Sequence, residues 1–244
     1  MIKKLFAILT LLISSGTAFA VDNVDFRLKA GINLGGTTPL DLPAEIRKIE
    51  TYTPSLIPSI EANFHYLFPN GKGFGLSAGL RLEYKGMSTT AEVMQYKVSM
   101  VISSGDTPGQ AGGYFTGVVK IKALNGYIIL PVLLTYDLGS RWRFGLGGFA
   151  AIDIDRTFTG EAKDGDLYNL ESHQYVESAT YDFSKDIRRF DFGAQAGTDC
   201  RVTEKLAVTA QLTWSITPLF QKGFTSVAYK LYNIYGNLGF AYLF

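Results

Sequence analysis

Cysteine, histidine and charge of a single sign are all scarce in this 244-residue sequence, which has one cysteine, two histidines, 23 basic and 22 acidic residues. A lone cysteine excludes a disulfide framework and a cysteine-rich zinc cluster, and two histidines leave little material for a histidine-based metal site. The balanced charge gives no basic field to hold a nucleic-acid backbone. No long apolar run follows the first twenty residues. We therefore expect no metal, no nucleic-acid partner and no membrane-spanning helix.

The first twenty residues have the three parts of a secretory signal peptide. Lys3 and Lys4 give a basic start, residues 5–13 are apolar, and Ala18-Phe19-Ala20 is a small-x-small cleavage site. The apolar run is too short for a stable membrane span. We predict export, with residues 1–20 as the signal peptide and residues 21–244 as one domain.

Glycine and aromatic residues are abundant, with 26 glycines, 17 phenylalanines and 14 tyrosines. This composition is typical of many short strands joined by tight turns. Apolar and polar side chains alternate over most of eight segments, and a period of two places them on opposite faces of a strand. The fourth segment is apolar on both faces, so its parity stays open. The predicted strands are 25–35, 59–67, 74–85, 123–136, 142–153, 190–199, 206–215 and 232–244.

Alternation alone fits two kinds of barrel. A soluble lipocalin-like barrel holds its apolar side chains inside, whereas an outer-membrane barrel turns them toward lipid. Strands of about ten residues are long enough to cross a bilayer, and short turns at one end with long loops at the other are typical of outer-membrane barrels. The short connections are 68–73, 137–141 and 203–205, and the long ones are 36–58, 86–122, 154–187 and 216–228.

Aromatic residues gather where the apolar face of each strand reaches its ends, as in the girdles at lipid headgroup level. Near the short turns they are Phe26, Tyr66, Phe74, Tyr136, Trp142 and Phe244, and near the long loops Tyr84, Trp214 and Tyr232. We predict an all-β, eight-stranded antiparallel up-and-down transmembrane barrel. It is monomeric, with periplasmic termini and turns, and extracellular loops. Because an open edge is costly in hydrocarbon, the first strand should pair with the eighth.

Four segments carry a resemblance to a known family. They are the signal peptide, residues 31–34 (Gly-Ile-Asn-Leu), residues 127–134 (Tyr-Ile-Ile-Leu-Pro-Val-Leu-Leu) and residues 238–244, which end in Phe244. The sequence resembles the PorT-like outer-membrane β-barrel family of the Bacteroidota, although Ile129 stands where that family often has an acidic residue. The resemblance implies the barrel fold, an outer-membrane location and a link to secretion of surface proteins. The terminal Phe resembles the signal read by the barrel-insertion machinery.

Residues 75–79 (Gly-Leu-Ser-Ala-Gly) match the G-x-S-x-G nucleophile motif. That motif requires a sharp turn from strand to helix, whereas here it lies within a strand. If the neighbouring strands pair residues whose numbers sum to 142, His65 faces Ser77 and Glu61 faces Arg81. A His–Ser pair suits acyl transfer in a lipid deacylase, but His65 lies near the periplasmic turns, away from outer-leaflet lipid. We expect no catalytic residue, and we interpret the small residues as lumen filling.

Charged residues of both signs occupy the predicted inner face. An eight-stranded barrel has an interior just wide enough for its own side chains, and unpaired buried charge is costly. We therefore expect a plugged lumen of paired charges, with a small-solute channel as the alternative. The residues are Arg27, Lys29, Glu61, Arg81, Glu83, Lys85, Asp153, Asp191, Asp199 and, with its parity open, Arg201.

The long connections differ in character. Segment 154–187 has eight acidic residues against three basic ones, which we interpret as a solvated acidic loop rather than a cation site, since Asp164-Gly165-Asp166 is far short of an EF-hand. Residues 93–102 and 114–121 look like strands that extend the third and fourth barrel strands into a protruding hairpin. Residues 43–52 have the pattern of one or two helical turns. Cys200 should face lipid.

The sequence therefore predicts an outer-membrane protein with a structural or binding role, exerted through its extracellular loops. The alternatives are a channel or transport porin, a lipid-modifying enzyme and a soluble lipocalin-like carrier. We expect no enzyme activity and no cofactor, catalytic, cofactor-binding or metal residue. The expected partners are outer-membrane lipids including lipopolysaccharide, the barrel-insertion machinery and an unidentified extracellular ligand or protein.

Overall fold

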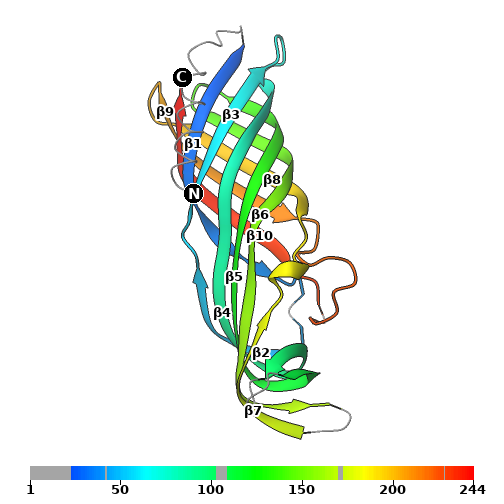
Figure 1. Ribbon diagram of the computed structural model, residues 1–244. Helices are drawn as coiled ribbons and strands as arrows, with labels where there is room; N and C mark the ends of the chain where they lie inside the picture. The colour runs from blue at the N-terminus through cyan, green and yellow to red at the C-terminus, as the bar shows by residue number, and fades with distance from the viewer. Residues whose placement is uncertain (1–22, 42, 103–108, 170–172, 228) are drawn as a thin grey trace.

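The computed structural model describes residues 23–41, 43–102, 109–169, 173–227 and 229–244 (Figure 1). The predicted signal peptide lies outside these ranges. Among the described residues, no helix is long and apolar enough to span a membrane. In the described part of the chain, the regular elements are strands and one short 3-10 helix, η2 (Ser184–Asp186).

A single antiparallel sheet of ten strands forms the fold. The strands are β1 (Val24–Thr38), β2 (Ile46–Pro54), β3 (Pro58–Leu67), β4 (Phe74–Ile102), β5 (Gly109–Leu138), β6 (Trp142–Tyr168), β7 (His173–Asp182), β8 (Phe190–Arg201), β9 (Leu206–Ser215) and β10 (Tyr232–Leu243). Their antiparallel pairing confirms the predicted fold class.

The sheet closes into a ring. Hydrogen-bonded neighbours run from β1 through β3, β4, β5, β6, β8, β9 and β10. β10 returns to β1 with a register from Arg27 opposite Leu243 to Thr38 opposite Tyr232. The predicted pairing of the first and last strands is thus confirmed. Each of the eight ring strands thus has a paired neighbour on both sides, which is the arrangement that a lipid environment requires.

The remaining two strands, β2 and β7, take the places of β3 and β8 in the sheet beyond the ends of those two ring strands. Both β3 and β2 pair with β4, and β2 takes over the pairing beyond the end of β3. In the same way β8 and β7 both pair with β6. The connections predicted as long loops, 36–58 and 154–187, therefore contain strands.

The prediction of helical turns at 43–52 is wrong, because β2 occupies most of this segment. Ile46, Ile49, Thr51 and Thr53 are β-branched and favour strand geometry. The long strand β4 also offers a free row of backbone partners from Met87 to Val93. Pairing with that row satisfies the backbone of β2, and a short isolated helix would lack comparable support.

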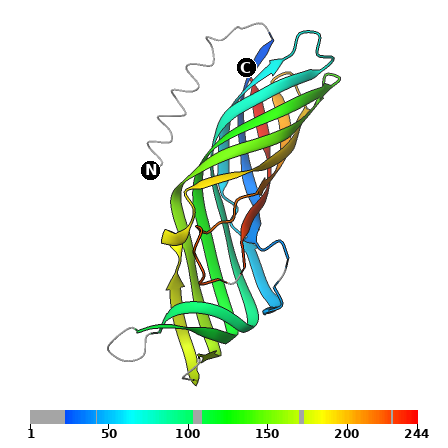
Figure 2. The ribbon, with the colours of Figure 1, turned by 90° about the vertical axis from the view of Figure 1, so that its right-hand side faces the viewer.

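β4 and β5 are the longest strands, with 29 and 30 residues, and they stay paired from Phe74 and Tyr136 to Ile102 and Gly109. Figure 2 shows them running well beyond the ends of β1 and β10. This confirms the predicted hairpin extension from 86–122. We call the end that carries it the long-loop end, and the opposite end, where residues 68–73, 139–141 and 202–205 connect the strands, the short-turn end.

Side chains in the ring alternate between an apolar outer surface and a buried interior. On β5, Leu130, Val132 and Leu134 are exposed, whereas Ile129 and Leu133 are buried. These positions settle the parity that the sequence left open. Large exposed apolar residues lie on all eight ring strands, as expected of a barrel whose outer surface meets lipid.

Aromatic pairs surround the short-turn end. The rings of Phe74 and Tyr136 lie 4.9 Å apart, and those of Phe26 and Phe244 lie 5.2 Å apart. These positions belong to the girdle predicted from the sequence. Phe26 itself is buried, at 7% exposure, because Phe64 packs against it from the next strand.

Candidate functional site

The centre of the lumen is a network of charged and amide side chains around Arg81. Its guanidinium donates hydrogen bonds to Gln195, at 2.8 Å, and to Gln211. It also lies 3.5 Å from a carboxylate oxygen of Glu61 and 3.4 Å from one of Glu83. Strands on opposite sides of the ring meet at this one side chain, so Arg81 fills the middle of the barrel.

Lys85 closes this network on the side of the long-loop end. Its ammonium lies 3.2 Å from a carboxylate oxygen of Glu83. It also lies between 5.2 and 5.7 Å from the ring centres of Tyr127, Phe149 and Tyr235, within cation–π range. This aromatic cage holds a buried cation that has few hydrogen bonds. It marks the boundary of the charged lumen on the side of the long-loop end.

A second group of charges fills the lumen near the short-turn end. Asp199 accepts hydrogen bonds from Arg27, at 3.0 Å, and from Lys29, at 3.1 Å. Arg143 contacts Asp137 through two nitrogens and reaches Asp25 at 3.3 Å. The opposite charges thus neutralise one another across strands that are distant in sequence.

The charged residues predicted to face inward do so. Eight of them are buried, whereas Lys29 and Arg201 are half-buried. The two cavities found among the lumen side chains hold about 20 Å³ each, roughly the space of one water molecule. Glycines keep the interior this narrow: a Cβ at Gly193 would lie 2.5 Å from the Phe149 ring. Around these two cavities, the described side chains fill the lumen.

His65 and Ser77 face each other across β3 and β4, and Glu61 faces Arg81, as the register predicts. The histidine and the serine nevertheless bond to other partners. Nε2 of His65 lies 2.9 Å from Oγ1 of Thr135, and Ser77 donates to Asn63 at 2.7 Å. Residues 75–79 lie within β4, without the turn that a nucleophile motif needs. The structure does not assemble a His–Ser pair.

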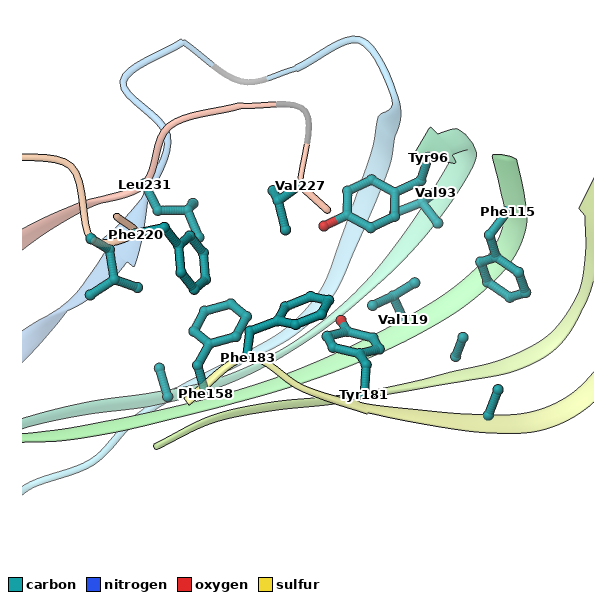
Figure 3. Close-up of a cluster of buried hydrophobic side chains, with 14 of the residues drawn as sticks. Val93, Tyr96, Phe115, Val119, Phe158, Tyr181, Phe183, Phe220, Val227 and Leu231 are labelled. Carbon is teal, nitrogen blue, oxygen red and sulfur yellow. The ribbon is translucent and has the colours of Figure 1, made fainter. Parts of the chain in front are cut away.

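At the long-loop end the interior becomes apolar. Residues 216–227 and 229–231, which we call the cover segment, lie between β9 and β10 and cross the inner face of the extended β4–β5–β6 sheet (Figure 2). Phe220 packs against Phe158, with ring centres 5.0 Å apart, and against Phe224 at 4.2 Å. Figure 3 shows Phe220, Val227 and Leu231 facing the aromatic side chains of the sheet.

Sequence reasoning treated the cover segment only as a long loop. A weak signal is present, since Leu219, Phe220, Phe224 and Val227 are apolar residues in a connection predicted only as long. They lack the period of a strand or helix, so their burial depends on the surface that they cover. That surface belongs to strands remote in sequence.

A cavity of about 130 Å³ lies beside the cover segment, and we call it the apolar chamber. Its lining comes from the end of β1, from β2, from the extended parts of β4, β5 and β6, and from Tyr229 and Leu231 of the cover segment. No charged residue is among the described residues that line it. Side chains that shape it include Met87, Ala91, Val119, Ile121, Phe158 and Leu231.

Two tyrosine hydroxyls meet at the wall of the chamber, beyond the ring at the long-loop end and outside the apolar band of the barrel. Tyr229 donates a hydrogen bond of 3.5 Å to Tyr96. Burial raises the pKa of Tyr96 well above its usual value, and it raises the pKa of Tyr229 as well. Both hydroxyls are therefore neutral at physiological pH, so the chamber offers hydrogen bonding without charge.

Much of the acidic segment 154–187 is strand. β6 and β7 pair with a register from Thr159 opposite Asp182 to Tyr168 opposite His173. Two of the segment's acidic side chains have charged or titratable neighbours: Glu161 lies 3.1 Å from Lys163, and Asp166 lies 2.9 Å from His173. Among the described residues, no group of three or more ligating side chains is placed to hold a metal ion. Cys200 is half-buried, on the same parity as the exposed side chains of β8.

Solved outer-membrane proteins align with most of this chain at low sequence identity and low TM-score. The attachment invasion locus protein Ail of Yersinia pestis, solved with a heparin analogue, is 8% identical, with a TM-score of 0.35 over 91% of this chain and 97% of that one. OprG of Pseudomonas aeruginosa is 13% identical, with a TM-score of 0.36 over 90% and 95%. The Escherichia coli protease OmpT is 12% identical, with a TM-score of 0.33 over 93% and 98%. These scores are too low to transfer any role.

No curated protein matches the sequence. A sequence profile of the outer membrane protein beta-barrel domain, however, matches residues 18–221, which is most of the chain. The closed antiparallel ring and the apolar outer surface agree with that match. The chain belongs to the outer membrane protein beta-barrel domain family.

Proposed function

We propose that this outer-membrane barrel is a non-conducting, non-enzymatic binding protein whose ligands meet it at the long-loop end, on the extracellular side. The contrast in open space supports this role most directly. The lumen leaves cavities of about 20 Å³, whereas the long-loop end holds a chamber of about 130 Å³. Ligand sites are typically concave and apolar with a few polar groups, and the chamber has these properties.

Conductance measurements test the non-conducting part of the proposal. The folded barrel in a planar bilayer should give no discrete current steps, because paired side chains block the lumen. A variant carrying Arg81→Ser with Gln195→Ser and Gln211→Ser removes the centre of the network and serves as the opened comparison. Discrete steps from the unmodified protein would refute this part of the proposal and favour the channel alternative.

Assays on lipid test the proposed lack of enzyme activity. We expect no deacylation of phospholipid or lipid A by the folded protein, because His65 and Ser77 bond to Thr135 and Asn63 instead of each other. Activity that disappears in His65→Ala and in Ser77→Ala would support the lipid-modifying alternative.

The resemblance to PorT-like proteins supports a second proposal, that the protein assists secretion of surface proteins. It rests on analogy of fold, which by itself does not carry function. Deletion of the encoding gene should then lower the amount of exported surface protein, and the deletion complemented by the unmodified chain is the control. Unchanged secretion after deletion would contradict this proposal without affecting the binding role.

A further inference from the structure

The wall of the barrel has a gap beside the apolar chamber, between β2 and the C-terminal part of β1. β1 pairs with β3 only as far as Ile32, opposite Pro58. Beyond that point β1 continues to Thr38 while paired with β10, and β2 pairs with β4. No strand pairing joins β1 to β2 among the described residues.

Side chains replace the missing strand along this edge of β1. The carbonyl oxygen of Gly35 accepts a hydrogen bond from the Tyr52 hydroxyl, and the amide of Thr37 donates to the sulfur of Met87 at 3.4 Å. Thr37, Tyr52 and Met87 also line the chamber. The chamber therefore borders the gap, and these side chains separate the two.

Part of the chamber lining is exposed on the β2 side of this gap. Two of its lining side chains, Ile49 and Tyr52, are 51% and 47% exposed. Apolar side chains flank the same place on the outside, since Leu34, Leu40 and Leu56 are all exposed. The apolar outer surface of the ring therefore continues to the gap beside the chamber.

We infer that the apolar chamber binds an uncharged hydrocarbon group, which enters from the outer part of the bilayer through the gap between β1 and β2. The uncharged lining would leave a charged ligand without a partner, which is costly in an apolar site. The volume is close to that of the cavity of about 150 Å³ known to take up benzene. Such a group is either a free apolar solute or the end of a lipid acyl chain.

This inference deepens the proposed binding role by naming the ligand class, and photolabelling tests it. The folded barrel in lipid nanodiscs is irradiated with one of two probes, and labelled residues are mapped by mass spectrometry. One probe is a free, uncharged aryl diazirine. The other is a phosphatidylcholine with a diazirine at the end of an acyl chain. We expect at least one of them to label inward-facing chamber residues such as Val119 and Ile121, besides the lipid-facing residues.

A pair of tryptophan substitutions provides the matched control. Ala91 lines the chamber, and Ala91→Trp fills it, whereas Ala150 lies on β6 between the exposed side chains of Leu130 and Phe192. Chamber labelling should fall at least tenfold in Ala91→Trp and stay unchanged in Ala150→Trp. If Ala91→Trp does not fold, as judged by gel mobility without boiling, Val119→Phe takes its place, with Ile121 as the labelled position.

The outcomes separate the possible answers. Chamber labelling by the lipid probe identifies an acyl chain, and labelling by the free probe alone identifies an apolar solute. Labels confined to lipid-facing residues, or chamber labels that persist in the filled variants, overturn the inference. Neither of these results bears on conductance, so the non-conducting role stands or fails separately.

Discussion

The ring and the long-loop end are built by the same strands with opposite distributions of polarity. On β4, Arg81, Glu83 and Lys85 point inward, and two residues further on Met87 begins an apolar inner face that includes Ala91. The outer face changes in the reverse sense. On β5, Leu130 is exposed in the ring, whereas Lys120 and Lys122 are exposed beyond it.

This reversal locates the change of solvent along the strands. Where lipid surrounds the barrel, apolar side chains point outward and the charges must be satisfied inside. Where water surrounds it, the apolar side chains turn inward and form a core. The same side of a strand can thus face inward along its whole length while its side chains change from charged to apolar. The reversal between Lys85 and Met87 therefore places the edge of the lipid-facing band beside the gap between β1 and β2, where Met87 contacts Thr37.

The largest effect should come from breaking the charged network. Arg81→Ala leaves Glu61 and Glu83 buried beside a lost partner, and removal of one member of a buried ion pair costs about 3–5 kcal/mol. Urea unfolding of the barrel in lipid vesicles measures this loss of unfolding free energy. Arg141→Ala, at an exposed turn position, should change it by less than about 0.5 kcal/mol. Equal effects of the two variants would contradict the proposed structural role of Arg81.

A smaller and local effect should follow from loosening the long-loop end. Phe220→Ala removes a ring from the cover segment and should cost about 3 kcal/mol of local packing. The cover segment should then be cleaved faster by protease, while the ring keeps its unboiled gel mobility. Ile216→Ala, at a position 69% exposed, is the control. Unfolding of the whole barrel in Phe220→Ala would show that the two regions are not separable.

Alkaline pH should loosen the long-loop end without any mutation. Burial raises the pKa of Tyr96 and of Tyr181 above the ordinary value of about 10. Above that pH the unfolded chain loses protons that the folded core retains, so stability falls as pH rises. Stability should be insensitive to these groups below pH 9. Tyrosinate absorbance during the titration checks this, and Tyr96→Phe with Tyr181→Phe should weaken the dependence.

The part of the fold with a strong local signal was predictable from sequence. Alternating segments gave the ring strands, and the spacing of the turn at 68–73 gave the register that places Glu61 opposite Arg81. The paired lumen followed from charges on the polar face of each strand. β2 was misread as helix because its pattern is short, and its conformation depends on pairing with the distant extension of β4.

The apolar chamber was not predictable in the same way. It depends on the cover segment, whose apolar residues have no regular period. It also depends on neighbouring strands that extend to different lengths toward the long-loop end. Gly36 illustrates the difficulty. A Cβ there would lie 3.2 Å from the sulfur of Met87, a contact that sequence position alone does not reveal. Only the assembled sheet shows that the end of β1 pairs with β10 but has no partner strand on its other side.

The closing pair of strands also sets the order in which the barrel can assemble. Asn237 on β10 donates a hydrogen bond to Asn33 on β1, 204 residues away in sequence. Contacts of such separation form late, because most of the chain's conformational entropy is lost before they can compensate for it. Until β10 arrives, the edge of β1 is an unsatisfied template for any passing strand. A chain stalled before its last strand would therefore be prone to aggregate, which makes completion of the ring the decisive step in its biogenesis.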